Sequence, residues 1–170
     1  IEALKKYDSH QYLINRLSKN GQRYLFYTVS EALKRDLPVE LSLIPFIESQ
    51  FDPYAQSSTG ASGIWQFIPS TAIENGLKKN WWYDARRDIV ASTEAAYNFL
   101  VKLHQEHDDW LIAIAAYNAG PSRVRKEIRK NKAKGLPTDF WSLNLPKETK
   151  AYVPKILALS EVIRNPKLSN

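Results

Sequence analysis

The sequence predicts an all-α protein built as one domain. Apolar residues recur at helical spacing along nearly the whole chain, and no stretch alternates convincingly between apolar and polar residues. The chain of 170 residues is long enough to bury a core, and it contains no internal repeat or low-complexity tract. We expect residues 1–35 to form a short N-terminal helical extension that packs on the main unit, residues 36–170.

Two predicted helices open the chain. The first covers residues 12–21 and ends on Gly21, because glycine commonly stops a helix. The second covers residues 22–38, where apolar residues recur at helical spacing, and it ends before Pro38. Together these two helices make up the predicted N-terminal extension.

A buried central helix is predicted over residues 39–49, which are apolar almost all round. Pro45 lies inside this segment and removes one backbone donor, which predicts a bend one turn before Glu48. A carboxyl group packed against apolar side chains ionises at a cost, so we expect a raised pKa for Glu48, as a general acid near neutral pH requires. From the local sequence alone, a surface Glu at a helix end is the simpler interpretation.

Turn residues and then a helix are predicted over residues 57–76. Thr71 and Glu74 have the spacing of a capping box at the helix start. The small residues before Gln66 allow a backbone or a ligand to come close. A plain β-turn that leads into a helix explains the same residues equally well.

Four more helices are expected in the rest of the chain. Residues 88–107 predict a long amphipathic helix with Asp88 placed to cap it. Residues 109–121 predict a short, Ala-rich, buried helix that stops at a Gly-Pro pair. A basic helix follows at residues 123–134, and a last helix runs from about residue 146 to residue 164.

Two pairs of polar residues lie at the ends of these helices. Tyr117 and Asn118 end the Ala-rich helix, where they could project into a cleft as hydroxyl and amide donors. Glu148 and Tyr152 are spaced i, i+4 and therefore share one face of the last helix. Taken alone, each pair has a simpler interpretation. Tyr117 and Asn118 would be a core Tyr beside an Asn-Gly helix stop. Glu148 and Tyr152 would be a surface Glu beside a half-buried aromatic residue.

The charge balance favours anionic partners. The chain has 24 Lys and Arg against 18 Asp and Glu, a net charge of +6, which suits nucleic acid, anionic lipid or acidic wall polymers. Residues 123–134 concentrate seven basic residues and one acid. A solvated helix face is the favoured interpretation of this segment, because no base-reading motif accompanies it. We therefore expect no nucleic-acid partner.

A cluster of three aromatic residues, Trp81, Trp82 and Tyr83, stands out in an otherwise polar stretch. Aromatic side chains can stack on the faces of sugar rings, as in many binding sites. Core packing is nevertheless the commoner explanation, and it is the one that the sequence favours.

Several kinds of site are excluded by composition and motif. The chain has no Cys, so disulfides and thiolate metal sites are absent, and no serine-nucleophile or nucleotide-binding motif is present. His104 and His107 are spaced i, i+3 but lack a convergent third ligand, so we expect no metal and no cofactor. No run approaches the roughly 18 apolar residues of a membrane span. Because the chain has no Met, we expect it to be a processed or excised part of a longer polypeptide.

Four short stretches follow one another at characteristic spacing. They are ES at 48–49, GASGIWQFIPSTA at 60–72, AAYNAG at 115–120 and ETKAYV at 148–153. In this order they resemble the lytic transglycosylase domain, the lysozyme-like family that cleaves peptidoglycan. The wider similarity covers nearly the whole chain and implies a goose-type, lysozyme-like helical fold, with residues 36–170 as the catalytic domain.

The resemblance implies roles for seven residues. Glu48 is implied to be the single catalytic acid and base, and Ser57 to hold the N-acetyl group of the reacting sugar or the departing oxyanion. Contacts with the substrate are implied for Gln66, Tyr117, Asn118, Glu148 and Tyr152. The chain departs from many family members at Ile64-Trp65, where Leu-Met is usual, and we expect this to change packing rather than chemistry.

The implied reaction is non-hydrolytic cleavage of the β-1,4 bond between N-acetylmuramic acid and N-acetylglucosamine, which leaves 1,6-anhydro ends. Most glycosidases use two carboxylates about 5 to 9.5 Å apart. Between Glu48 and Gln66 the only other acid is Asp52, which a turn-forming role explains better because Pro53 follows it. We therefore expect the substrate's own N-acetyl group to replace the second carboxylate. A lysozyme-type hydrolase and a non-catalytic module that binds wall polymer or nucleic acid are the alternatives.

The resemblance also implies a partner and a location. The partner is the glycan strand of peptidoglycan, on which the protein acts as a monomer in cell-wall remodelling. The location is the periplasmic face of the bacterial cell envelope, with a lipid anchor and wall-binding repeats in segments outside this chain.

Overall fold

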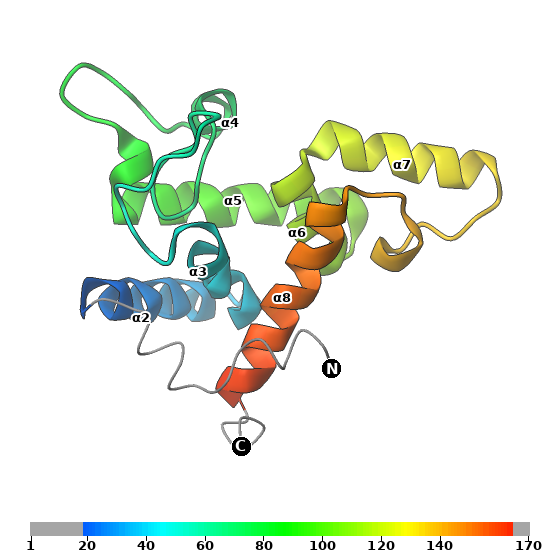
Figure 1. Ribbon diagram of the computed structural model, residues 1–170, viewed down its shortest axis with the longest axis horizontal. Helices are drawn as coiled ribbons and strands as arrows, with labels where there is room; N and C mark the ends of the chain where they lie inside the picture. The colour runs from blue at the N-terminus through cyan, green and yellow to red at the C-terminus, as the bar shows by residue number, and fades with distance from the viewer. Residues whose placement is uncertain (1–18, 165–170) are drawn as a thin grey trace. The chain divides into compact units, whose positions relative to one another are not determined.

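The computed structural model describes residues 19–164, with side chains described for residues 20–161. This part of the chain forms seven α-helices and three short 3-10 helices, and its only β-type pairings are isolated bridges (Figure 1). The all-α prediction is therefore confirmed. The predicted helix at residues 12–21 lies mostly outside the described residues.

The chain divides into two compact units. The first comprises Ile1–Asn98 with Ile156–Asn170, and the second comprises Phe99–Lys155. Helices α5 (Ile89–His107) and α8 (Lys147–Arg164) each contain one of the two boundaries. A separate N-terminal extension ending near residue 35 stays a prediction.

Helix α2 (Lys19–Lys34) opens the described part of the first unit. It runs through Gly21, so the predicted helix stop at this residue is wrong. Glycine stops a helix efficiently where it adopts a positive φ, whereas inside a helix it is tolerated at a cost of about 1 kcal/mol. The chain instead leaves α2 through Asp36, whose φ is 57°, before Pro38 as predicted.

The predicted buried helix at residues 39–49 is two short helices. A 3-10 helix, η1 (Val39–Leu43), is followed directly by α3 (Ile44–Ser49). Pro45 therefore lies in the first turn of α3 and not inside a longer helix, as the sequence had predicted. A missing N–H costs nothing in the first turn, because it has no intrahelical partner there.

Helix α4 (Pro69–Glu74) starts three residues earlier than the predicted capping box requires. Ile68 is its N-cap residue and makes no capping hydrogen bond through its side chain. The predicted Thr71–Glu74 capping box is therefore wrong, because Pro69 begins the helix and places Thr71 inside it.

The chain then reaches α5 through the 3-10 helix η2 (Ala85–Arg87). Asp88 caps α5 as predicted, since its Oδ1 accepts a hydrogen bond of 2.9 Å from the backbone N–H of Ala91.

The core of the first unit joins its helices through aromatic and aliphatic side chains. Its largest fully buried members include Leu41, Ile44, Phe51, Ile64, Trp65 and Tyr97. The Tyr97 hydroxyl donates a 2.7 Å hydrogen bond to the backbone carbonyl of Thr28, which ties α5 to α2. Burial raises the pKa of this hydroxyl, so it stays protonated as a donor.

The second unit contains α6 (Trp110–Ala119), α7 (Pro121–Ala133), the 3-10 helix η3 (Phe140–Ser142) and the first part of α8. The predicted Ala-rich, basic and last helices are confirmed. Gly120 separates α6 from α7 with a φ of 92°, and Pro121 follows at the first position of α7. Such a Gly-Pro pair ends one helix and starts the next.

Within the residues described, no helix is both long enough and apolar enough to cross a membrane.

Candidate active site

Glu48 lies in the last turn of α3 with a half-buried side chain. Its neighbour Ser49 donates a 2.9 Å hydrogen bond from its hydroxyl to the backbone carbonyl of Ile64. This bond fastens the last turn of α3 to residues 55–67, which we call the site loop. The site loop contains Ser57 and Gln66, so the structure brings these predicted residues onto a segment bound to the helix end that bears Glu48.

Asp52 has the turn-forming role that the sequence predicted. Its side chain is exposed, and its Oδ1 accepts a 2.9 Å hydrogen bond from the backbone N–H of Tyr54. Just before it, Gln50 and Phe51 both adopt left-handed backbone angles, with φ values of 53° and 61°. Two consecutive left-handed residues end α3 abruptly and turn the chain toward the site loop.

The site loop is folded by its own backbone hydrogen bonds. The N–H of Ser57 donates to the carbonyl of Ala61 at 2.9 Å, and the N–H of Gly63 donates to the carbonyl of Ala55 at 3.1 Å. The Ser57 hydroxyl accepts from the N–H of Ala61 at 3.0 Å and lies 2.9 Å from the Thr59 hydroxyl. The position of the Ser57 oxygen is therefore fixed without any ligand.

The side chain of Gln66 stabilises the site loop by hydrogen bonds to the loop's own backbone. Its side-chain Nε2 donates to the backbone carbonyls of Ala55 at 3.1 Å and Gly63 at 2.9 Å. Its backbone is left-handed, with a φ of 51°. Both amide hydrogens are used within the loop, so the amide oxygen is the group left to meet a ligand.

Arg86 clamps the site loop onto η2. It is only 5% exposed, and its Nη1 donates to the carbonyls of Gly60 at 2.7 Å and Phe67 at 3.1 Å. Its Nε and Nη2 bind the carboxylate of Asp84, with Nη2 at 2.7 Å from Oδ2. The Arg86 guanidinium beside Asp84 lowers the pKa of that carboxyl.

This contact between Arg86 and the site loop was not predicted from the sequence. Its only sequence signal is an Asp two residues before an Arg, which many exposed turns share.

The site loop lies directly against the backbone of η2 at Gly63. A Cβ atom at this position would lie 1.8 Å from the carbonyl oxygen of Arg86, and the backbone has a φ of +82°. Only glycine fits such a position. The small residues of this segment were expected to let a backbone or a ligand come close. At Gly63 it is the protein's own backbone, at Arg86, that comes close.

Trp65 anchors the site loop in the core. Its side chain is fully buried, and its Nε1 donates a 3.0 Å hydrogen bond to the hydroxyl of Thr93. Its ring packs edge-on against Tyr97, with centroids 5.3 Å apart and an interplanar angle of 76°. These contacts agree with the expectation that Trp65 changes packing rather than chemistry.

The other predicted site residues belong to the second unit. Tyr117 and Asn118 lie at the end of α6, both half-buried. The Asn118 Oδ1 accepts a 2.8 Å hydrogen bond from the hydroxyl of Thr149. Glu148 precedes Thr149 in the first turn of α8 and is exposed, whereas Tyr152, one turn later, is buried. The structure thus brings Asn118 to the turn that bears Glu148.

The histidines noted in the sequence have other contacts. His104 stacks on the ring of Trp110, with centroids 4.0 Å apart and an interplanar angle of 19°. In the part of the chain that the structure describes, no group of three or more His, Cys, Asp or Glu could hold a metal ion.

Most of the basic side chains of α7 point into solvent. Arg125 forms an ion pair with Glu106 at 3.0 Å, and Lys130 forms one with Glu127 at 2.7 Å. The exposed remainder in the helix consists of Arg123, Lys126, Arg129 and Lys132, and the exposed Lys134 follows directly after it. These positions agree with the favoured interpretation of a solvated helix face.

Comparison with known sequences connects these features to one family. The model of the transglycosylase SLT domain matches residues 28–139. The membrane-bound lytic murein transglycosylase D of Escherichia coli (strain K12) is 49% identical over 167 residues, which are 98% of this chain and 37% of that protein. A putative tributyltin chloride resistance protein of Alteromonas sp. (strain M-1) is 40% identical over 151 residues, 88% of this chain and 72% of that protein.

Solved structures give the same connection. The 70 kDa soluble lytic transglycosylase SLT70 of Escherichia coli matches with a TM-score of 0.59 and 25% identity, over 78% of this chain and 23% of that one. The lytic transglycosylase Slt of Pseudomonas aeruginosa, in an inactive mutant with one Glu replaced by Gln, matches with a TM-score of 0.57 and 26% identity, over 84% of this chain and 24% of that one. The chain thus spans little more than a third of the Escherichia coli relative at 49% identity.

Proposed function

The chain belongs to the transglycosylase SLT domain family, and we propose that it cleaves the glycan strands of peptidoglycan without consuming water. The bond cut is the β-1,4 bond between N-acetylmuramic acid and N-acetylglucosamine, and the products carry 1,6-anhydro-N-acetylmuramic acid ends. The observation that carries this proposal is a half-buried carboxylic acid, Glu48, on a helix end fastened to a rigid loop of hydrogen-bonding groups.

In the proposed mechanism Glu48 acts first as an acid and then as a base. Protonated Glu48 donates its proton to the glycosidic oxygen, and N-acetylglucosamine departs. The carbonyl of the muramic N-acetyl group supports the positive charge at the anomeric carbon. Glu48, now ionised, takes the proton of the C6 hydroxyl of the same sugar, whose oxygen attacks the anomeric carbon. The proton returns to Glu48, so no water, metal or cofactor is consumed.

Two observations support the proposed mechanism, in which Glu48 is an essential carboxylic acid without a second catalytic acid beside it in the sequence. Asp52, the only other acid between Glu48 and Gln66, is exposed and accepts a turn hydrogen bond. One structural relative, the Slt protein of Pseudomonas aeruginosa, is described as inactive when a single Glu is replaced by Gln.

The site loop is proposed to receive the reacting sugar. Ser57 holds the N-acetyl group or the departing oxyanion, and its oxygen is already positioned by the N–H of Ala61. Gln66 meets the glycan through its amide oxygen. Contacts with the glycan strand are also proposed for Tyr117, Asn118, Glu148 and Tyr152 of the second unit.

The proposal places the protein on the periplasmic face of the cell envelope. This placement is supported by the relative in Escherichia coli, which is a membrane-bound lytic murein transglycosylase. We propose that the protein acts there as a monomer in wall remodelling, held by a lipid anchor outside this chain.

The test is a digest of purified peptidoglycan, with the products identified by mass. The protein is expected to release anhydro products, which are lighter by one water than the reducing ends that a lysozyme-type hydrolase leaves. Glu48→Gln should lower the rate by about 10²- to 10⁴-fold without unfolding the domain. Asp52→Asn is the matched control, because Asn can accept the same turn hydrogen bond, and it should stay active. If Glu48→Gln still cleaved peptidoglycan at the original rate, the mechanism would be refuted.

A further inference from the structure

Two adjacent tryptophans protrude from the first unit. Trp81 and Trp82 are each 88% exposed, so core packing, which the sequence favoured, is wrong for both. They belong to residues 78–84, which we call the tryptophan loop. Burying such rings in a binding partner is favourable, and large exposed aromatic groups often mark a binding surface.

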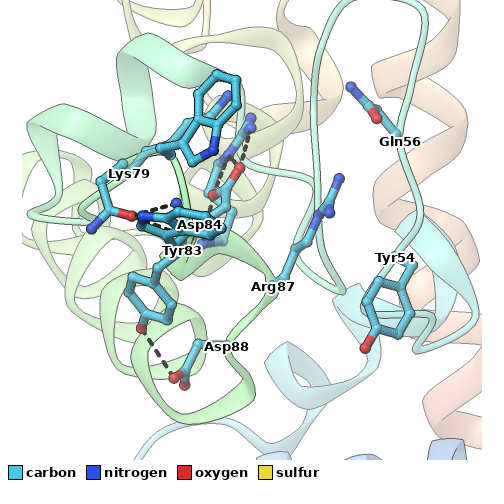
Figure 2. Close-up of a pocket in the computed structure, with 11 residues that line it drawn as sticks. Tyr54, Gln56, Lys79, Tyr83, Asp84, Arg87 and Asp88 are labelled. Atoms are coloured by element: carbon cyan, nitrogen blue, oxygen red, sulfur yellow. Dashed lines mark hydrogen bonds and ion pairs between the residues drawn. The ribbon is translucent and has the colours of Figure 1, made fainter.

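The tryptophan loop is held in one conformation by its own polar groups. The Asn80 Oδ1 accepts from the N–H groups of Trp82 and Tyr83, both at 2.8 Å, and the Asn80 N–H donates to the Tyr83 carbonyl at 2.8 Å. The Tyr83 hydroxyl donates to the Asp88 carboxylate at 3.1 Å (Figure 2). A surface that is ordered before binding loses little conformational entropy when a ligand arrives.

A cavity of about 480 Å³ lies beside the loop. Its lining combines the tryptophan loop with residues from two other segments, among them Tyr54, Gln56 and Arg87 (Figure 2). Ligand cavities in proteins are commonly about 300 to 1,000 Å³, so this one is large enough for a sugar unit. Gln56 belongs to the site loop and directly precedes Ser57, so the site loop contributes to the cavity wall.

The cavity is lined by three cationic side chains, Lys79, Arg86 and Arg87, and by two carboxylates, Asp84 and Asp88, so its net charge of +1 favours an anionic ligand. The Asp84 carboxylate is bound by Arg86, and the Asp88 carboxylate accepts from Tyr83 and from the N–H of Ala91. Lys79 and Arg87 also line the cavity, and neither forms an ion pair with another residue in the described part of the chain. Two cations beside aromatic rings match a polymer that combines sugar faces with carboxylates.

We propose that the tryptophan loop and its cavity bind a further segment of the peptidoglycan strand. Sugar faces stack on Trp81 and Trp82, and carboxylates of the stem peptides face Lys79 and Arg87. The identity of this polymer rests on the proposed function. Exposed Trp beside Lys also suits a membrane interface. The cavity favours the glycan, because a bilayer would leave hydrogen-bonding groups in its lining, such as the side-chain amide of Gln56, without partners.

The experiment measures binding without turnover. Glu48→Gln protein is mixed with insoluble peptidoglycan, and the bound fraction is measured by sedimentation over a range of protein concentrations. Adding Trp81→Ala and Trp82→Ala should weaken binding about tenfold, since each stacked ring contributes about a factor of two to ten. Lys79→Glu should also weaken binding and reduce its dependence on salt. Trp141→Ala is the matched control, because Trp141 is 63% exposed and belongs to the second unit.

Two outcomes would overturn the proposal: unchanged binding in the double variant, or equal weakening in Trp141→Ala. Circular dichroism checks that each variant is folded. If the double variant is unfolded, Lys79→Glu decides, and unchanged binding in that variant overturns the proposal. A parallel measurement uses vesicles of phosphatidylglycerol. If the double variant loses vesicle binding but keeps peptidoglycan binding, the loop faces a membrane and the proposal is wrong. Binding is scored without cleavage, so a failure here is distinct from a failure of the transglycosylase mechanism, which the mass of the digest products reports.

Discussion

Replacement of Gly63 by Ala tests whether the site loop depends on its close contact with η2. The added Cβ would lie 1.8 Å from the Arg86 carbonyl oxygen and 2.7 Å from its carbon, and contacts under 3.0 Å do not persist, so the two backbones must separate by more than 1 Å. A non-glycine residue at a φ of +82° costs about 1–2 kcal/mol. Separation also weakens the bonds from Arg86 to the loop, at about 1.5–3 kcal/mol for each charged hydrogen bond lost. The expected total is about 3–5 kcal/mol.

Gly76→Ala is the matched control for this substitution. Gly76 has a similar φ of +79°, but a Cβ there would meet nothing within 4 Å. It should therefore show the backbone cost alone, about 1–2 kcal/mol. Both free energies of unfolding come from urea titrations followed by circular dichroism. The reasoning is refuted if the two variants differ by less than about 0.5 kcal/mol, the usual scatter between independent sites.

The same substitution should also reduce activity while the protein is still folded. Displacing the loop by about 1 Å moves Ser57 and Gln66, and a misplacement of that size can cost about a hundredfold in rate. The rate of peptidoglycan cleavage is measured at a temperature below the unfolding transition. Full activity in Gly63→Ala would show that the contact matters for stability alone.

Three further predictions concern polar side chains that hold the backbone through hydrogen bonds or ion pairs. Arg86→Met should destabilise the protein by about 3–5 kcal/mol in urea unfolding, because it leaves the Asp84 carboxylate unpaired and two loop carbonyls without a donor. In the folded state the pKa of Asp84 is lowered below the usual 3.8, so the ionised carboxylate stabilises the fold above about pH 4, and this stabilisation is lost as the pH falls through the folded pKa. Asp84→Asn should therefore flatten this part of the curve of unfolding free energy against pH. An unchanged slope would contradict the role of Asp84. Asp109→Ala should cost about 1 kcal/mol in thermal unfolding, because its Oδ1 caps α6 by accepting from the N–H groups of Leu111 and Ile112; a loss below about 0.3 kcal/mol would contradict the capping role.

The sequence was sufficient for those parts of the fold that depend on local chemistry. Asp88 was identified as the cap of α5, and the Gly-Pro pair at 120–121 as the end of α6, because these signals act within one turn of helix. Asp52 was identified as a turn residue for the same reason. Helical class followed from the spacing of apolar residues.

The features that local chemistry could not predict depend on distant contacts. Gly63 meets the carbonyl of Arg86, and Arg86 holds both Gly60 and Phe67, across 19 to 26 residues of sequence. The exposure of Trp81 and Trp82 was also unpredictable, because no local signal separates an aromatic side chain in the core from one on the surface.

The errors at Gly21 and Pro45 had a different cause. Gly and Pro affect a helix differently according to their position in it, and the sequence does not give that position. Gly21 lies within α2 and does not end a helix, and Pro45 lies in the first turn of α3 and does not bend one.

The central claim is that Glu48 cleaves the glycan strand with a hydroxyl of the substrate in place of water. Digestion of peptidoglycan in water enriched in oxygen-18, followed by mass spectrometry of the new muramic acid ends, tests this claim most directly. The account predicts anhydro ends that contain no oxygen-18. Ends that carry one oxygen-18 atom would contradict it, because they would show that a water molecule attacked the anomeric carbon.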